Sequence, residues 1–304
     1  MFFFGRFCAI GAEEVRYENL RVFRVSRGSD FANYYFLPGN PANRNLVICL
    51  DGRGKHSVLG IEENGVWKSM SFPYLLRKNL SPKFDVLALD RINTEIGREP
   101  DPKLVGLDTF QNKLAFYGQI IDEFLETKPE YKTVVLVGYS EGGFILPRLF
   151  LGLKSQKKIS GLVLCASGGF SFYDNLKFQQ ISTANFSLKY RKSLDRLDQT
   201  IAEIRASYNA TDKFYFGWPY SKWAYFMSYR PAEDLKKIDL PLLILHGDKD
   251  LNIPVESSRH IVDELYKAGK PNYSYREYRG ADHHFNGRFD WVVADIEAWI
   301  TKSK

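Results

Sequence analysis

The chain of 304 residues has few cysteines, no long apolar run and no strong excess of charge of either sign. Its three cysteines are too few, and odd in number, for a disulfide framework, which argues against a small disulfide-stabilised fold. Cys49 and Cys165 each lie inside an apolar run, which predicts two small buried hydrophobic side chains.

No stretch reaches the roughly 18 consecutive apolar residues that span a membrane, so no transmembrane anchor is expected. The N-terminus, MFFFGRFCAIGAEE, is apolar but short, is interrupted by Arg6, and lacks the basic start of a secretory signal. A cytoplasmic location is therefore favoured, although an exported form with a trimmed signal stays open.

The formal net charge is +6, and the basic residues are scattered as short doublets rather than gathered in a run or stripe. Nucleic-acid binding is accordingly not expected. The histidines and cysteines show no spacing typical of metal ligands, so no metal or other cofactor is implied. The sequence does not indicate an oligomeric state.

Short apolar runs alternate with helical patterns, which is typical of a parallel sheet covered by helices. Strands are predicted at 20–25, 34–37, 46–50, 85–89, 134–137, 162–165, 242–245 and 273–278. Helices are predicted at 109–126 with Asp108 as N-cap, at 142–153 with a kink or late start at Pro147, and at 188–206, 255–268 and 291–300.

Residues 170–239 interrupt this alternation, because they contain many aromatic side chains and no strong strand pattern. A loop of this length is usually functional or contains elements of its own. The segment is either a peripheral helical subdomain or a cap over a site, and its surplus of aromatics favours the cap. The predicted division is a core of 1–169 and 240–304 with a mostly helical cap of 170–239.

The stretch VVLVGYSEGGF at 134–144 places Ser140 between glycines, at a predicted strand-to-helix turn. Gly138 and Gly142 flank it at G-x-S-x-G spacing, which leaves room for a sharp turn that exposes the hydroxyl. The turn also leaves the amide of Glu141 free at a helix N-terminus, where negative charge is favoured. Ser140 is therefore a candidate nucleophile.

A serine nucleophile requires a base and an acid that orients the base. His283 and its neighbour His284 follow the last predicted strand, in GADHHF. Asp248 and Asp250 follow an earlier apolar strand, in HGDKDLNIP. Both loops are expected at the carboxyl edge of the sheet, where Ser140 also lies.

These segments resemble the α/β-hydrolase superfamily in kind, order and position, from about residue 20 to the end. The resemblance implies the α/β-hydrolase fold, a mostly parallel central sheet flanked by helices, with the cap inserted before the acid-bearing strand. In that superfamily the acid ends G-x-x-D ahead of a Val/Ile-Pro pair, which implies Asp250, and the base ends G-x-x-H, which implies His283. Asp248 and His284 remain the alternatives.

The resemblance also implies an oxyanion hole made by the amide of Glu141 and one amide of the loop LDGRGKH at 50–56. Arg53 is favoured for the second amide, with Gly54 as the alternative. The carboxylate of Glu141 stands near a site for negative charge, so it requires a partner, for which Arg53 and Arg91 are candidates. An arginine that holds a substrate carboxylate is the other interpretation.

Cleavage of a carboxylic ester through an acyl-enzyme is the predicted activity. Thioesterase and peptidase activities remain alternatives, as do a lyase and a binding protein without turnover on the same scaffold. The expected partner is a small-molecule ester or acyl substrate. Candidate pocket residues are Tyr139, Trp218, Trp223 and Phe226, and His246 is a further side chain that could line the pocket.

Overall fold

The computed structural model describes residues 15–17, 20–40, 42, 44–59, 61–63, 66–68, 71–98, 104–183 and 188–302. The N-terminal segment 1–14, for which a trimmed signal was considered, and Cys8 lie outside the described residues. No helix among the described residues is long and apolar enough to cross a membrane.

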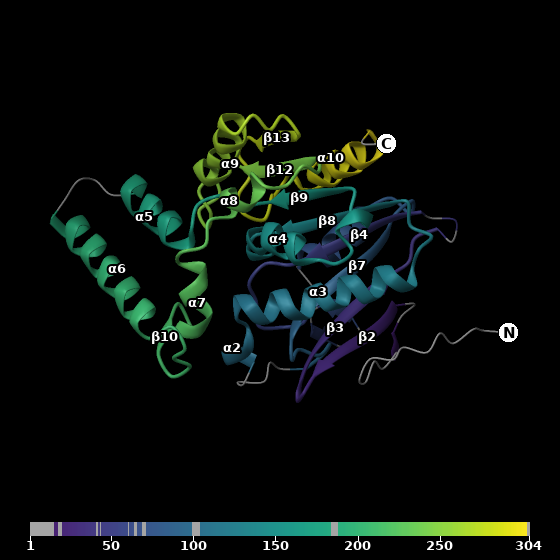
Figure 1. Ribbon diagram of the computed structural model, residues 1–304, viewed down its shortest axis with the longest axis horizontal. Helices are drawn as coiled ribbons and strands as arrows, with labels where there is room; N and C mark the ends of the chain where they lie inside the picture. The colour runs from purple at the N-terminus through teal and green to yellow at the C-terminus, as the bar shows by residue number, and fades with distance from the viewer. Residues whose placement is uncertain are drawn as a thin grey trace.

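A nine-stranded sheet forms the centre of the molecule, in the order β1-β2-β3-β7-β4-β8-β9-β12-β13 (Figure 1). Neighbours from β7 to β13 pair in parallel, whereas the pairs β1–β2, β2–β3 and β3–β7 are antiparallel. The strands are β1 (Val15–Tyr17), β2 (Leu20–Arg27), β3 (Asp30–Leu37), β4 (Asn45–Leu50), β7 (Asp85–Ile92), β8 (Thr133–Tyr139), β9 (Gly161–Cys165), β12 (Leu242–Gly247) and β13 (Tyr273–Tyr278). Each predicted strand lies within one of them, and the mostly parallel α/β fold is confirmed.

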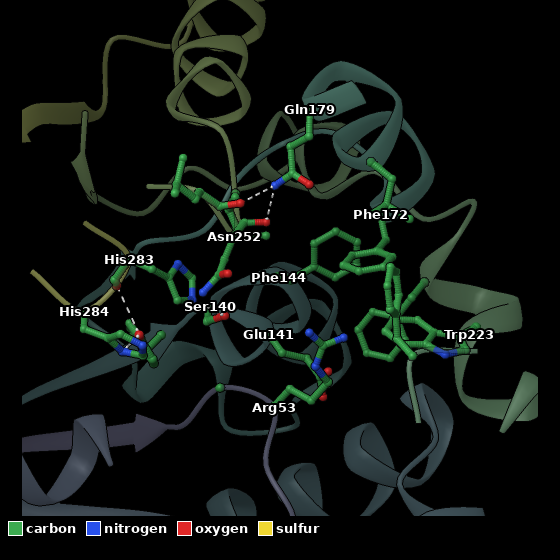
Figure 2. A pocket seen from close by; sticks show the side chains of 17 residues that line it. Arg53, Ser140, Glu141, Phe144, Phe172, Gln179, Trp223, Asn252, His283 and His284 are labelled. Atoms are coloured by element: carbon green, nitrogen blue, oxygen red, sulfur yellow. Dashed lines mark hydrogen bonds between the residues drawn. The ribbon is translucent and has the colours of Figure 1, made fainter. Parts of the chain in front are cut away.

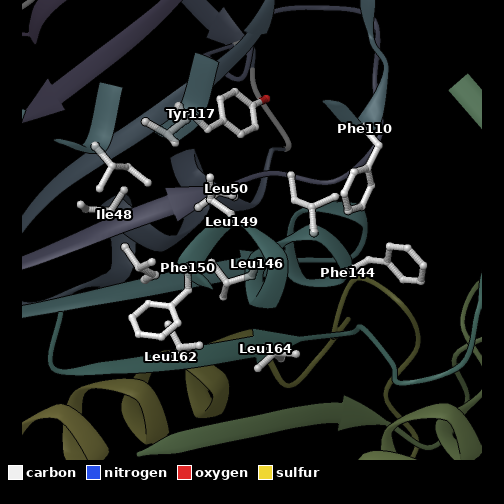
Figure 3. Packing of buried hydrophobic residues seen from close by; sticks show 14 of the residues in the cluster. Ile48, Leu50, Phe110, Tyr117, Phe144, Leu146, Leu149, Phe150, Leu162 and Leu164 are labelled. Atoms are coloured by element: carbon white, nitrogen blue, oxygen red, sulfur yellow. The ribbon is translucent and has the colours of Figure 1, made fainter. Parts of the chain in front are cut away.

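Helices cover both faces of this sheet. They are α1 (Phe72–Asn79), α3 (Phe110–Thr127), α4 (Glu141–Gly152), α9 (Val255–Lys267) and α10 (Phe289–Lys302). The short helix α2 (Leu104–Leu107) precedes α3, and the 3-10 turn η1 (Gln156–Lys158) connects α4 to β9. Alternate residues of a buried strand enter opposite layers. In β4, Ile48 and Leu50 pack in the layer that holds α3 and α4 (Figure 3), whereas Val47 and Cys49 pack in the layer of α1 and α10.

Two details differ from the prediction. Thr109, not Asp108, caps α3, because its hydroxyl accepts a hydrogen bond from the Asn112 amide at 3.2 Å. Asp108 is buried and pairs instead with two lysines. Helix α4 begins at Glu141 and contains Pro147 in its interior, so the late start is wrong. Cys49 and Cys165 are fully buried, as predicted.

The segment between β9 and β12 contains the helices α5 (Phe172–Thr183), α6 (Leu188–Ala206), α7 (Tyr220–Phe226) and α8 (Pro231–Leu235) and a small hairpin of β10 (Phe214–Tyr215) and β11 (Trp218–Pro219). Another hairpin, of β5 (Ile61–Glu63) and β6 (Val66–Lys68), lies elsewhere in the chain. Helices α5 and α6 stand to one side of the sheet, and α7 lies between α6 and the core (Figure 1). Many aromatics of the insertion join the main core: Phe226, for example, packs on Phe110 and Phe144.

Candidate active site

Ser140 occupies the turn between β8 and α4, with a φ of 52° and a ψ of −118°. A positive φ is costly for a residue with a Cβ, at about 1–3 kcal/mol, and persists only where the surroundings enforce it. Here the Ser140 amide donates to the carbonyl of Cys165 at 2.9 Å, and its carbonyl accepts from the amide of Phe144 at 3.0 Å. These bonds hold the turn, and the side chain of Ser140 is left half-exposed.

The flanking glycines make this turn sterically feasible. A Cβ at Gly138 would lie 2.6 Å from Cα of Gly143, and a Cβ at Gly142 would lie 2.5 Å from the carbonyl oxygen of Leu50. Backbone atoms obstruct both positions, and backbone cannot swing aside as a flexible side chain can. The spacing in G-x-S-x-G therefore reflects close packing of α4 against β8 and the end of β4.

Replacement of Gly142 by alanine is expected to lower the free energy of unfolding by about 1–3 kcal/mol, because the added methyl group must displace the end of β4. Gly152→Ala on the same helix is the matched control. Apart from the adjacent residues and the backbone of α4 itself, no heavy atom of the described residues lies within 4 Å of a Cβ at Gly152. We therefore expect that variant to be neutral or up to about 1 kcal/mol more stable. Urea unfolding of both variants measures the difference, and equal stability would contradict the steric argument.

Three side chains from separate loops meet at the carboxyl edge of the sheet. His283 Nε2 lies 3.0 Å from Ser140 Oγ, and His283 Nδ1 lies 2.7 Å from Asp250 Oδ2. The other carboxylate oxygen of Asp250 accepts the amides of Asn252 and Ile253, each at 2.8 Å. The order hydroxyl, imidazole, carboxylate is the arrangement in which a histidine can remove the serine proton.

Asp250 is held as a carboxylate. Burial raises its pKa, but hydrogen bonds from His246 and His283 outweigh burial and lower the pKa to about 2. His246 is fully buried, with Nε2 3.1 Å from Asp250 Oδ2 and Nδ1 3.1 Å from the carbonyl oxygen of Ser167. The sequence suggested His246 only as a pocket residue, whereas in the structure it contacts the carboxylate of Asp250. The one sequence feature that could have indicated this contact is the position of His246, four residues before Asp250.

The alternative acid and base have other partners. A carboxylate oxygen of Asp248 accepts the amide of Gly280 at 2.6 Å, which ties the acid loop to the histidine loop. His284 Nδ1 lies 2.8 Å from the hydroxyl of Tyr139. Within the described residues, His283 is the only histidine with a hydrogen bond to Ser140.

Arg91 braces the loop that follows β4. Its guanidinium contacts Asp51 Oδ2 at 2.6 Å, the carbonyl oxygen of Gly52 at 3.0 Å and that of His56 at 2.5 Å. A Cβ at Gly52 would lie 3.0 Å from Cβ of Ser140. The loop is thus held tightly against the serine.

Neither predicted partner of the Glu141 carboxylate contacts it: Arg91 pairs with Asp51, and no ion pair between described residues joins Arg53 to Glu141. Glu141 Oε1 instead contacts Lys113 Nζ at 2.5 Å and Lys222 Nζ at 3.1 Å. Both ammonium groups also pair with Asp108. We refer to Asp108, Lys113, Glu141 and Lys222 as the buried charge cluster; it contains two cations and two anions.

The pKa of Glu141 lies well below its usual range. Burial by itself raises this pKa. The positive charges of Lys113 and Lys222, followed by that of Arg53, lower the pKa by more than burial raises it. Glu141 is therefore ionised, and its charge is balanced within the cluster. Because Lys222 belongs to α7 and Glu141 to α4, the cluster links the inserted segment to the serine turn. No sequence motif signals these pairings.

A cavity of about 510 Å³ opens next to Ser140 and His283. Of the predicted pocket residues, Tyr139, Trp223 and Phe226 line it. Trp218 does not line it; this side chain is buried under Lys222, whose Nζ lies 4.2 Å from the ring centroid. Sequence reasoning missed several lining residues that the structure adds (Figure 2): Phe144, Phe172, Leu176, Gln179, Phe216, Leu251, Asn252 and Ile253.

No group of three or more His, Cys, Asp or Glu side chains within the described ranges has an arrangement that could hold a metal ion.

Comparison with known proteins identifies the family. A model of the alpha/beta hydrolase family matches residues 36–295. The chain belongs to the α/β-hydrolase family. A search of curated protein sequences gave no match.

Three solved structures illustrate the fold that this α/β hydrolase shares with other proteins. Est1E from Butyrivibrio proteoclasticus, in complex with ferulic acid, has 14% identity and a TM-score of 0.61, over 96% of this chain and 99% of that one. An esterase from Pyrococcus furiosus has 14% identity and a TM-score of 0.56, over 94% and 90%. A bromoperoxidase from Bacillus anthracis has 16% identity and a TM-score of 0.54, over 92% and 99%. At these identities the likeness shows the fold alone.

Proposed function

We propose that this α/β hydrolase is a serine hydrolase that cleaves a carboxylic ester through an acyl-enzyme. The observation that carries the proposal is the hydrogen-bonded series Ser140, His283, Asp250 at the wall of a cavity of about 510 Å³. A cavity of this size suits a small molecule. The name of the Pyrococcus furiosus neighbour, an esterase, agrees with the reaction class.

In the proposed mechanism, Oγ of Ser140 attacks the ester carbonyl carbon while its proton passes to Nε2 of His283. The tetrahedral intermediate then collapses, the bond to the leaving oxygen breaks, and the imidazolium returns the proton to the departing alcohol. A water molecule, deprotonated by the same imidazole, then attacks the acyl carbon. The bond from that carbon to Oγ breaks, the acid leaves, and the imidazolium returns the proton to Oγ of Ser140. The carboxylate of Asp250 orients His283 and stabilises its charged form.

The amides of Glu141 and Arg53 are the proposed oxyanion donors. Within the described residues, neither amide donates a hydrogen bond. The preceding carbonyl, of Gly52, accepts from Arg91. Because N–H and C=O point in opposite directions across a trans peptide, the Arg53 amide points away from Arg91. Gly54, the alternative, packs directly on that guanidinium.

Residues 170–239 are proposed to act as a cap on the core formed by 1–169 and 240–304. Helices α5 and α7 contribute aromatic and aliphatic side chains to the cavity wall. Gln179 of α5 donates to the carbonyls of Leu251 and Asn252, at 2.8 and 2.7 Å, which joins the segment to the acid loop. An apolar wall favours an ester with an apolar acyl or alcohol group over a thioester or peptide, which are the alternatives on the same three residues.

Labelling by a fluorophosphonate probe tests the nucleophile. The wild-type protein is expected to be labelled, because the probe phosphonylates an activated serine, whereas folded Ser140→Ala should not be labelled. Competition by a 4-nitrophenyl ester links the labelling to ester binding. A folded wild-type protein without labelling would contradict the proposal and would favour a binding protein without turnover.

A further inference from the structure

Arg53 presents a cation to the cavity that none of the proposed catalytic steps uses. Its side chain is exposed and lines the cavity beside Ser140. Figure 2 shows the guanidinium directed into the cavity, between Ser140 and the aromatic side chains of Phe172 and Trp223. The proposed mechanism uses only the backbone amide of this residue, so the role of its charge requires a separate explanation.

The carboxylates near Arg53 have other groups as their direct partners, and the guanidinium adds only a longer-range contribution to the low pKa of Glu141. Glu141 contacts Lys113 and Lys222 in the buried charge cluster, whose formal charges cancel. Asp250 accepts from His283 and from two backbone amides. No ion pair or hydrogen bond between described residues involves the Arg53 side chain, so the positive charge of its guanidinium remains available in the cavity.

Two aromatic rings support the guanidinium. Its central carbon lies 5.2 Å from the ring centroid of Trp223 and 5.8 Å from that of Phe172. Guanidinium is weakly hydrated and stacks readily on aromatic faces, which leaves its N–H edge free to donate in its own plane. A planar carboxylate accepts two parallel N–H bonds from such an edge. Arg53 is the one Lys or Arg among the described residues that line the cavity. A single arginine suits one carboxylate better than a phosphate dianion.

We propose that Arg53 binds a carboxylate of the substrate, so that the natural ester carries a free carboxylate group on the arm that enters the aromatic part of the cavity. This proposal rests on the proposed hydrolysis at Ser140. It refines the substrate class to esters in which the arm that packs on the aromatic side chains also carries a carboxylate within reach of Arg53.

Two matched pairs of esters test it, one for each arm of the substrate. On the alcohol side, 4-acetoxybenzoate is compared with 4-acetoxybenzamide; on the acyl side, monomethyl glutarate is compared with methyl glutaramate. The readout is the ratio of kcat/KM for the carboxylate ester to kcat/KM for its neutral amide. Hydrogen bonds to charged groups make a difference of about tenfold or more, so Arg53→Met and Arg53→Gln should lower this ratio by about that factor for at least one pair.

Lys55→Met is the matched control. It removes one positive charge from the same loop, but Lys55 does not line the cavity, and its Nζ lies 5.7 Å from the ring centroid of Trp218. Its ratio is expected to stay within about twofold of the wild-type ratio, because exposed charges outside the site are screened by salt. Ratios that fall equally in Lys55→Met and Arg53→Met would indicate a general field effect and would overturn the proposal.

A binding measurement separates this proposal from the proposed hydrolysis. Calorimetry on Ser140→Ala should detect binding of at least one of the two carboxylate esters. This binding should be about tenfold weaker in Ser140→Ala/Arg53→Met than in Ser140→Ala/Lys55→Met. Such binding without turnover by the wild type would support the carboxylate site and contradict the hydrolase. Turnover by the wild type with a kcat/KM ratio that Arg53→Met leaves unchanged would support the hydrolase and contradict the carboxylate site. If neither binding of a carboxylate ester nor a change in the ratio is observed, the proposed carboxylate site is overturned.

Discussion

Replacement of His283 by alanine is expected to lower kcat for a 4-nitrophenyl ester by about 10⁵- to 10⁶-fold, because loss of one member of such a catalytic set costs nearly as much as loss of all members. His283 is the described histidine that contacts both Ser140 and Asp250. Without the imidazole, no side chain catalyses removal of the proton from the serine oxygen or its later return. Initial rates with purified, folded variants measure the effect.

His284→Ala is the control beside it. His284 lines the same cavity but contacts the hydroxyl of Tyr139 rather than Ser140. A lost hydrogen bond of this kind costs on the order of 1 kcal/mol, or less than about tenfold in rate. If His284→Ala were inactive while His283→Ala kept its activity, the assignment of the base would be reversed.

Replacement of Lys222 by methionine is expected to lower the free energy of unfolding by about 3–5 kcal/mol, because it leaves an uncompensated negative charge in the interior. The Lys222 side chain is completely buried, and its ammonium group contacts Asp108 and Glu141. In the variant, Lys113 alone would face both carboxylates. Chemical denaturation followed by tryptophan fluorescence measures the loss.

Two variants define the cause of this loss. Lys236→Met removes a lysine that pairs with Glu233 and Glu264 but is 27% exposed, and an ion pair of that kind contributes about 0–1 kcal/mol. Adding Asp108→Asn to Lys222→Met restores the formal neutrality of the cluster and should regain part of the stability. A loss from Lys222→Met no larger than that from Lys236→Met would contradict the role of the cluster.

The buried charge cluster also explains how the serine turn tolerates an acidic neighbour. The amide of Glu141 is proposed to stabilise the oxyanion, while its side chain carries charge of the same sign. With Lys113 and Lys222 on that carboxylate, the negative charge is neutralised where it stands. Lys222→Met is therefore expected to affect catalysis as well as stability, and kcat should be measured at a temperature where the variant is folded.

Much of the fold was predictable from the sequence because the relevant signals are local. Alternating and continuous apolar runs depend on a few neighbouring residues, and each predicted strand lies within an observed one, with 273–278 matched at both ends. The helix at 188–206 was likewise predicted at both ends. Ser140 directly follows a strand, and Asp250 and His283 lie in the loops after two others. These positions placed all three at one edge of a parallel sheet, where the structure brings them together.

The sequence by itself thus determined the α/β class, because periodicity is encoded over a few residues. Its motifs resembled the family that the comparison then identified, and they supplied the candidate residues for the proposed chemistry. Only the tertiary structure decided which side chains share a buried space. In the structure Glu141 pairs with Lys222, which lies 81 positions away in the sequence. Asp108, predicted as a helix cap, belongs to the same cluster, and Trp218 packs under Lys222 rather than lining the cavity. Such pairings depend on the balance of burial and charge among distant segments, which no local pattern records.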